Sequence, residues 1–351
     1  MADGGELDRV SCLRRLRALL EEIDGSKVTL IGDTLLDRYH HGFANNLNST
    51  APVPVLKIFK SEESPGASAH IALGLNSLGM DVSFHCSLGD DVEGRAIIDA
   101  LSTDGISTSN ISILPDRRTL TKIRFYGSRE SLLENSQILL QADRGTQDSL
   151  SSEISQSLSL SALNSMENSC ALVISDYDKG VIQQEGSAQM IDRAKELGIP
   201  AIVDPKLTGL EKSRGATVVL FEIRGLELLR RRSMLNGSAE TAAHLIEAYQ
   251  WDSLVVLGGV NGLTLYQSDG SVFHVPCLAP NPEQQIGLHD AAATALAAAL
   301  GHGLSMVDAA SLAAAACECV LSAESSHEFV TKQTLGLWLD ELSWQMQISD
   351  R

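Results

Sequence analysis

The sequence KVTLIGDTLLD, at residues 27–37, decides the fold class. Its first part is largely apolar and β-branched and ends in glycine, which predicts a buried strand from Lys27 to Gly32. Asp33 and Asp37 follow, and in open α/β sheets the carboxyl ends of the strands face the crevice that binds ligands. We therefore expect both carboxylates to accept hydrogen bonds from a hydroxyl-rich substrate. The alternative is that Asp33 caps a helix and Asp37 faces solvent.

Strands and helices alternate beyond this stretch. Buried apolar runs predict strands at 82–86, 171–175, 201–203, 217–220 and 254–257. Helical spacing predicts helices at 67–78, 92–101, 183–197, 239–249, 290–300 and 306–323. This alternation is typical of a parallel sheet covered by helices. An amphipathic helix, from about Leu7 to Ile23, precedes the first strand; the weaker alternative for this segment is an organelle-targeting helix.

Two regions interrupt the alternation. Residues 39–60 and 118–141 carry short alternating patterns that predict strands, and the prolines at residues 51–55 (APVPV) suit an edge strand. We expect a small second sheet that covers a site or pairs with a second subunit. A serine-rich segment at 146–167 keeps its leucines at helical spacing, so a surface helix is predicted there.

Length and charge narrow the function classes. The chain has 351 residues, which suggests one large domain or two moderate ones, and its 27 Lys and Arg against 45 Asp and Glu give a net charge of −18. Such a chain repels phosphate backbones and anionic lipid, so we expect neither nucleic acid nor a membrane as a direct partner. The six cysteines are scattered without zinc-ligand spacing, which favours reduced thiols and a cytoplasmic location.

Three further motifs lie where strands end or helices begin. Residues 65–70 (PGASAH) open a helix, and their small side chains allow a ligand to approach the backbone. Residues 176–180 (DYDKG) and 204–206 (DPK) each follow a predicted strand. Carboxylates at strand ends beside Lys179 and Lys206 suit a phosphorylated or polyhydroxylated ligand. Any one of these motifs alone is compatible with an ordinary loop.

Residues 287–290 (GLHD) precede an alanine-rich run that predicts a helix. The first N–H groups of a helix have no partner within the helix and carry partial positive charge. Asp290 at this point could act as a base toward a hydroxyl, while the N–H groups hold charge on a transferred phosphoryl group. The alternative is that Asp290 simply caps the helix.

These segments, in this order, resemble the ribokinase (PfkB) family of carbohydrate kinases, most closely its heptose-7-phosphate kinases. The matching segments are residues 32–39, 51–55, 65–69, 119–124, 175–180 and 204–206. The resemblance implies an N-terminal helix at 1–26 and a ribokinase-like three-layer α/β/α domain at 27–345 with a mostly parallel sheet. It also implies a β-lid from 39–60 and 118–141, often the contact of a homodimer, and phosphorylation of a sugar or sugar phosphate with ATP and Mg²⁺.

The resemblance also implies roles for individual residues. Asp290 takes the place of the catalytic base. The substrate-binding positions are Asp33, Asp37, Gly66, Ala67, His70, Lys122 and Lys179. The nucleotide-binding positions are Lys206, Glu222, Gly258, Gly262, Gly287, Leu288 and His289, with Glu222 also the candidate ligand of the metal.

Several family motifs are altered in this chain. The Gly-Ala-Gly-Asp anion hole reads GLHD, and an Asn-x-x-Glu motif that organises the metal begins with Glu222 and ends with Gly225. A sugar-contacting Asn is His70, and the second Gly of the preceding turn is Ala67. Two hypotheses follow: a working sugar or sugar-phosphate kinase, or a catalytically impaired homologue. The second would act as a ligand-binding regulator or as a structural subunit with a protein partner.

Overall fold

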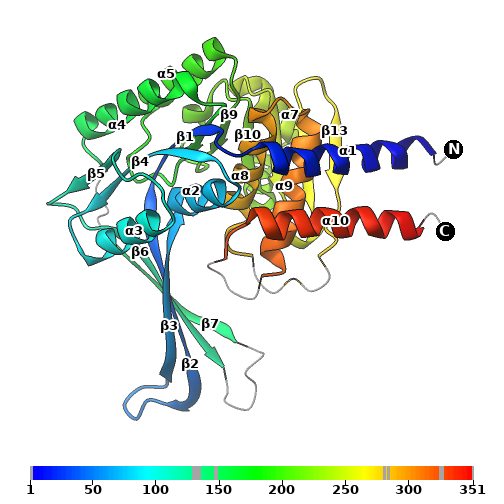
Figure 1. Cartoon of the computed structure of the whole chain (residues 1–351). Coiled ribbons are helices and arrows are strands. Elements are labelled where there is room, and N and C mark those ends of the chain that lie inside the picture. The colour runs from blue at the N-terminus through cyan, green and yellow to red at the C-terminus, as the bar shows by residue number, and fades with distance from the viewer. Residues whose placement is uncertain are drawn as a thin grey trace.

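The structure is a computed structural model that describes residues 3–128, 136–145, 149–279, 282, 285–323 and 328–349. Within them the chain forms a large sheet between two layers of helices, and a second, smaller sheet projects away from these layers (Figure 1). The predicted three-layer α/β/α class is confirmed.

The large sheet of the described chain has nine strands in the order β13-β12-β11-β10-β9-β8-β1-β4-β5. All pairs from β11 to β5 are parallel, and β12 and β13 extend one edge in antiparallel pairing. The strands are β1 (Lys27–Gly32), β4 (Asp81–Gly89), β5 (Ile111–Leu114), β8 (Ala171–Ser175), β9 (Ala201–Asp204), β10 (Val218–Glu222), β11 (Ser253–Leu257), β12 (Leu263–Gln267) and β13 (Val272–Val275).

Helices cover both faces of this sheet. One layer contains α1 (Asp3–Glu22), α2 (Ser68–Ser77), α3 (Val92–Thr103), α8 (Leu288–Gly301), α9 (Met306–Leu321) and α10 (Lys332–Ser349). The other contains α4 (Ser152–Ser165), α5 (Gln184–Leu197), α6 (Ile223–Arg232) and α7 (Ser238–Tyr249). Strand β8 serves both cores, because successive side chains of a strand point to opposite faces. Val173 packs in the first core, and Leu172 and Ile174 pack in the second.

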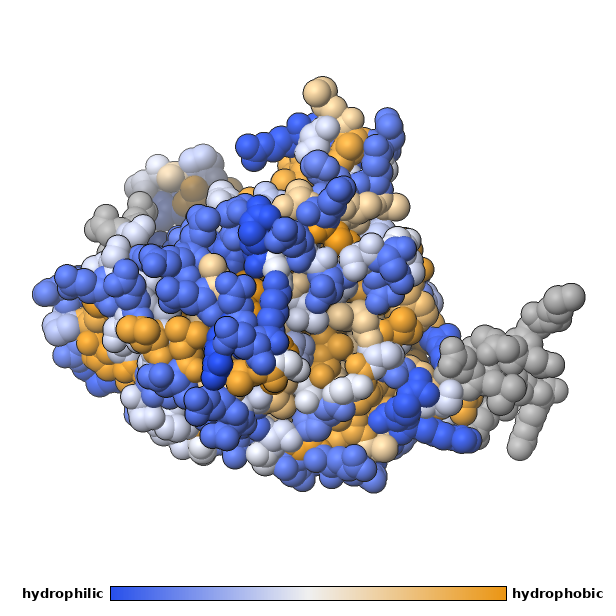
Figure 2. All heavy atoms as spheres, turned by 90° about the horizontal axis from the view of Figure 1, so that it is seen from above, coloured by the Kyte–Doolittle hydropathy of each residue, from blue (hydrophilic) through white to orange (hydrophobic). Residues whose placement is uncertain are grey.

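The outer surface is mostly hydrophilic where α4 and α5 lie. Seen from above, this face carries polar side chains with smaller apolar areas between them (Figure 2). In α4, Ser152 and Ser157 are exposed on this surface, while Ser155 and Ser159 are buried. The surface helix predicted at 146–167 is therefore confirmed as α4, although residues 146–148 lie outside the described part.

The small sheet has the strand order β3-β2-β6-β7. Its strands are β2 (Thr34–Leu47), β3 (Pro54–Ala67), β6 (Leu120–Ser128) and β7 (Gln137–Arg144). Strand β2 follows β1 after a single residue, so the chain passes directly from the large sheet into the small one. This sheet starts earlier than the expected segment 39–60, and Asp37 consequently lies within a strand.

Five elements of the described chain are absent from the sequence predictions. They are β5, β12, β13, α6 and α10. The first and last helices, α1 and α10, pack against each other and against α9 (Figure 1). Arg15 of α1 also forms an ion pair with the buried Asp308 of α9, with Nη2 and Oδ1 2.7 Å apart. Among the described helices, none is both long and apolar enough to cross a membrane.

Candidate active site

The carboxyl ends of adjacent parallel strands meet beside the start of α8. Strands β10, β9, β8 and β1 are neighbours, so the residues that follow them lie along one edge of the sheet. A cavity of about 610 Å³ opens there. Its lining includes Tyr177, Asp204, Lys206, Glu222, Arg224, Gly258, Gly287, Leu288, His289 and Asp290.

Asp290 lies in the first turn of α8, with its side chain only 10% exposed. Its Oδ2 lies 3.1 Å from Nδ1 of His70, and its Oδ1 has no hydrogen-bond partner among the described residues. The helix cap is Gly287, whose carbonyl accepts the N–H of Ala291, so the alternative that Asp290 caps the helix is wrong. A buried carboxylate oxygen at the cavity wall is suited to accept a proton from a bound hydroxyl.

Gly287 allows this close arrangement. Its φ of +89° lies in the left-handed region that favours glycine. A Cβ at this position would also lie 3.1 Å from Cε1 of His70. His70 comes from α2, and its ring packs edge-on against Phe329 at 5.9 Å between centroids. The glycine therefore lets the start of α8 approach the imidazole that holds Asp290.

His289 is held between two carboxylates. Its Nδ1 lies 2.8 Å from Oδ1 of Asp204 at the end of β9, and its Nε2 lies 3.9 Å from Oε1 of Glu222 at the end of β10. Burial lowers the pKa of His289, but the neighbouring negative charges, Asp204 first, outweigh this effect and raise it above its ordinary 6.5. These charges favour the protonated form of the imidazole, which lies where the family motif has glycine.

Asp37 on β2 and Gly66 on β3 are diagonal neighbours, and the Asp37 side chain lies over Gly66. Asp37 is 8% exposed and its Oδ1 accepts a hydrogen bond from Nη1 of Arg124 on β6 at 2.5 Å. Burial raises the pKa of Asp37, against the lowering effect of Arg124. A Cβ on Gly66 would lie 2.2 Å from Oδ2 of Asp37, so only glycine leaves room for this carboxylate. The alternative that Asp37 faces solvent is wrong.

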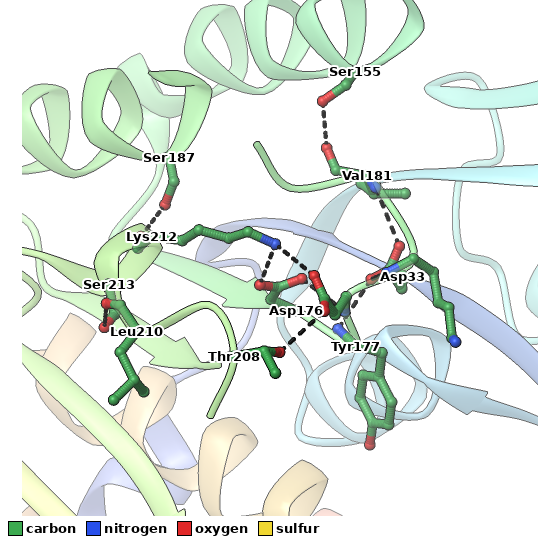
Figure 3. A network of polar contacts seen from close by, with 12 residues as sticks. Asp33, Ser155, Asp176, Tyr177, Val181, Ser187, Thr208, Leu210, Lys212 and Ser213 are labelled. Carbon is green, nitrogen blue, oxygen red and sulfur yellow. Dashed lines mark hydrogen bonds and ion pairs between the residues drawn. The ribbon is translucent and has the colours of Figure 1, made fainter. Parts of the chain in front are cut away.

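Asp33 organises the loop after β8 (Figure 3). Its carboxylate accepts the backbone N–H groups of Tyr177, Lys179 and Val181 at 2.9, 3.0 and 3.2 Å. It is 2% exposed and followed by a strand, so the alternative that it caps a helix is wrong. Its oxygens are engaged with the backbone in this structure, and its contact with a substrate stays a prediction.

The other substrate-binding candidates differ in where they lie relative to the large cavity. Ala67 is the N-cap of α2 with φ 55°, a backbone conformation that favours glycine. Lys122 of β6 lies over the ring of Tyr177, with Nζ 5.3 Å from the centroid. Lys179 borders a separate small pocket with Asp33 and does not line the large cavity. Lys122 therefore contacts a residue of the cavity wall.

The nucleotide-binding candidates also differ in whether they line the large cavity. Lys206, Glu222, Gly258, Gly287, Leu288 and His289 all line the cavity. Gly262 lies behind it, where a Cβ would come within 2.1 Å of the carbonyl oxygen of Val275. Close packing against Val275 explains why residue 262 is a glycine, and contact of Gly262 with a nucleotide stays a prediction.

Sequence reasoning assigned no role to three residues that shape the site. Tyr177 presents its ring between two lysines, with Nζ of Lys206 4.1 Å from its centroid. Lys212 lies 2.9 Å from the buried Asp176 and 3.2 Å from Asp178, which also accepts a hydrogen bond from Thr208 (Figure 3). Arg224 lines the cavity beside Glu222. Only Tyr177 had a signal, since it lies inside the DYDKG motif.

The two carboxylates at the strand ends of this cavity that could hold a magnesium ion both lie beside His289. Mg²⁺ in nucleotide sites is held by one or two carboxylates with waters and phosphates. Asp204 and Glu222 both face the His289 imidazole, and position 225 is glycine, with Leu207 beside it. Within the described ranges, no group of three or more His, Cys, Asp or Glu side chains could hold a metal. Glu222 as a metal ligand stays a prediction without support from this geometry.

Comparison with known proteins agrees with this architecture. A family model described as pfkB family carbohydrate kinase matches residues 26–332. The bifunctional protein HldE of Shewanella piezotolerans is 30% identical over 304 residues, 86% of this chain and 61% of that protein. HldE of Escherichia coli O9:H4 is 30% identical over 311 residues, 87% of this chain and 62% of that protein. The chain thus spans about 61% of the length of these relatives.

Solved structures share the fold at low sequence identity. Phosphofructokinase-2 from Escherichia coli, in complex with substrates and products, has a TM-score of 0.72 at 16% identity over 91% of this chain and 99% of its own. Arabidopsis thaliana ribokinase, complexed with ribose and ATP, has a TM-score of 0.67 at 15% identity over 90% of this chain and 99% of its own. The fold is therefore ribokinase-like.

Proposed function

Because the chain belongs to the pfkB family of carbohydrate kinases, we propose that it transfers the γ-phosphoryl group of ATP to a hydroxyl of a sugar or sugar phosphate. The observation that carries this proposal is the buried Oδ1 of Asp290, which lines the cavity at the start of α8 without a hydrogen-bond partner among the described residues. A general base has to keep one basic atom available to the substrate proton.

The reaction then uses groups of this chain at each step. Oδ1 of Asp290 takes the proton of the acceptor hydroxyl, and the hydroxyl oxygen forms a bond to the γ-phosphorus. The bond between that phosphorus and the β–γ bridging oxygen breaks, and ADP leaves with the electron pair. His70 holds Oδ2 at 3.1 Å and so orients the base. The N–H groups at the start of α8 stabilise the negative charge of the transferred group.

The acceptor is proposed to be heptose 7-phosphate or a closely similar sugar phosphate. The HldE relatives, at 30% identity, support this choice. Asp37 and Arg124 supply an acceptor and a donor for hydroxyls, and Lys122 supplies positive charge for a phosphate. These residues belong to β2 and β6 of the small sheet, which we propose as the lid of the site.

The same small sheet is proposed as the contact of a homodimer. Leu47, Ile58 and Phe59 from β2 and β3 are 69%, 48% and 57% exposed, and Leu140 of β7 is 57% exposed. Apolar side chains gathered on one element favour a protein interface over exposure to water. Light scattering over a concentration series should give a dimer that Phe59→Glu dissociates, while Leu160→Glu on α4 leaves it intact.

The test of the proposed function is turnover of Asp290→Asn. We expect ADP release with heptose 7-phosphate to fall by about a hundredfold or more, with ATP affinity and unfolding midpoint retained. Asp192→Asn, on the exposed side of α5, is the matched control and should retain activity. Undiminished turnover of Asp290→Asn would refute the assigned base.

A second candidate function is a binding protein that retains the kinase fold without turnover. It is favoured by the imidazole of His289 in the anion hole and by Gly225 in place of a carboxylate. Such a protein binds nucleotide or sugar phosphate and releases no ADP above the rate of the Asp290→Asn variant. The same assay therefore separates the two candidates.

A further inference from the structure

The ring of Tyr177 contacts two ammonium groups that come from different sheets. Nζ of Lys206, in the loop after β9, lies 4.1 Å from the ring centroid. Nζ of Lys122, on β6 of the small sheet, approaches the same ring, so both nitrogens lie within 5.3 Å of one point. Like charges repel each other at such distances, and the arrangement therefore favours a negatively charged group between the two lysines.

No carboxylate of the described chain fills that position. Lys122 is half-buried and Lys206 is exposed, and neither forms an ion pair or a hydrogen bond with a described residue. The carboxylates nearby lie beside other side chains: Asp204 and Glu222 flank His289, Oδ2 of Asp290 lies beside His70, and Asp37 binds Arg124. A lysine ammonium has three donors, so those of Lys122 and Lys206 are open to a ligand.

The backbone around Tyr177 is held by the network of polar contacts in Figure 3. Oδ2 of Asp33 accepts the backbone N–H of Tyr177 at 2.9 Å, and Oδ1 of Asp176 accepts that of Asp178 at 2.9 Å. Asp176 in turn lies 2.9 Å from Nζ of Lys212. The Tyr177 side chain points away from this network (Figure 3). Its ring is therefore a fixed surface for the two flexible lysine side chains.

We propose that Tyr177 is a positioning residue, whose ring holds Lys122 and Lys206 so that both ammonium groups bind one phosphate group. This inference rests on the proposed function, since it concerns a phosphate of the same reaction. Lysine binds phosphate as a point charge on a flexible stem, and contact with a fixed aromatic ring reduces the freedom that the stem loses on binding. Because Lys122 belongs to the small sheet, a phosphate bound by both lysines also connects the proposed lid to the large sheet.

Steady-state kinetics with ATP and heptose 7-phosphate tests the role of the ring. We expect Tyr177→Leu, Lys122→Met and Lys206→Met each to lower kcat/KM by about tenfold or more, whereas Tyr177→Phe keeps the ring and should stay within about threefold. A higher KM at retained kcat assigns the phosphate of the acceptor, and a lower kcat at retained KM assigns the phosphoryl group in transfer. Tyr249→Leu is the matched control, because that ring contacts Arg214 outside the cavity, and should leave both constants unchanged.

A variant background separates positioning from packing. When both Lys122→Met and Lys206→Met are present, Tyr177→Leu should lower kcat/KM by no more than about twofold, because the groups that the ring positions are absent. A ring that only packs keeps its full effect in this background, and that result overturns the inference. If Tyr177→Leu does not fold, the two lysine variants decide, and unchanged kcat/KM in both overturns the inference.

Failure of the inference and failure of the proposed function give different results. Turnover that Tyr177→Leu and the lysine variants leave unchanged overturns the inference and leaves the proposed function standing. If the unmodified chain releases no ADP, the proposed function is refuted, and calorimetric titration with heptose 7-phosphate then tests the inference. Binding that Tyr177→Leu weakens by about tenfold or more and Tyr177→Phe preserves supports it. Equal binding by the three proteins, or no binding by the unmodified chain, overturns it.

Discussion

Replacement of Gly66 by alanine should destabilise the protein through its effect on one carboxylate. The φ of Gly66 lies outside the left-handed region, so its backbone tolerates any residue. A Cβ at this position would lie 2.2 Å from Oδ2 of Asp37 and 2.7 Å from Cδ1 of Leu35, whereas real Cβ atoms stay at least 3.0 Å from their neighbours. The Asp37 oxygen therefore has to move by about 0.8 Å, the difference between 3.0 and 2.2 Å.

That displacement falls on a buried ion pair. Asp37 is bound to Arg124 at 2.5 Å, and the two side chains are only 11% and 9% exposed. A shift of this size lengthens the hydrogen bond toward its limit while the charges stay buried. From the usual cost of overpacking a core position, we expect Gly66→Ala to lower the free energy of unfolding by about 2 kcal/mol. Asp37→Ala, which leaves Arg124 without this partner, should cost about 3 kcal/mol.

Urea unfolding of single and double variants tests this reasoning. Asp37→Ala removes the closest clashing atom, while Cδ1 of Leu35 at 2.7 Å remains. Gly66→Ala should therefore cost less in the Asp37→Ala background, which gives a coupling of about 1 kcal/mol in the double-mutant cycle. Gly336→Ala is the matched control: it lies inside α10 with no atom closer than 3.7 Å to its added Cβ, and should stabilise by about 1 kcal/mol. Additive costs of Gly66→Ala and Asp37→Ala would refute the steric argument.

Three further predictions concern buried or positive groups. Burial lowers the pKa of His85 to about 4 from 6.5, so the unfolded chain binds this proton first and stability falls as pH drops from 6.5 toward 4. This difference in pKa corresponds to about 3 kcal/mol, and His85→Leu should remove this part of the pH dependence in urea unfolding. Lys212→Met leaves Asp176, whose side chain is 0% exposed, without its cation and should lower the free energy of unfolding by about 3 kcal/mol. Lys195→Met, at an exposed lysine, should change the free energy of unfolding little. Equal effects of the two variants would contradict the ion-pair argument. Asp204 and Glu222 raise the pKa of His289 above 6.5, so the affinity of the protein for sulfate should fall as pH rises through that pKa. Sulfate itself does not change its charge in this pH range. An affinity that does not depend on pH, or the same pH dependence in His289→Gln, contradicts this assignment.

The large sheet and its helices were predictable because their signals are local. A continuous apolar strand such as β1 and an alanine-rich helix such as α8 are visible in windows of six to fourteen residues. Helix α6 was missed although its sequence IRGLELLRRR is amphipathic, since it is short, has a glycine near its start and ends in a run of arginines. Strands β12 and β13 have only five and four residues and lie in antiparallel pairing at the sheet edge, outside the βα alternation.

The positions of the site residues were predictable from the sequence, but their contacts were not. Asp33, Asp37 and Asp290 each lie near a strand end or a helix start, which a local pattern can show. The partners of Asp33 lie 144 to 148 residues away, and those of His289 and Asp37 lie 85 and 87 residues away, so no local pattern reports them. For this reason the alternatives for Asp33 and Asp37 were settled only by the fold.

The altered residues of the anion site are linked through charge. Relative to the family pattern, glycine at 225 removes one negative charge, and His289 adds a group whose protonated form is favoured. Both changes shift the charge of the cavity in the positive direction, while Asp204, Glu222 and Asp290 still line it. Asp204 and Glu222 lie on opposite sides of the imidazole, and their charges raise its pKa above 6.5. The altered positions 225 and 289 thus belong to one group of charges around Glu222 and Asp204, and Asp290 lines the same space with one oxygen that has no hydrogen-bond partner among the described residues.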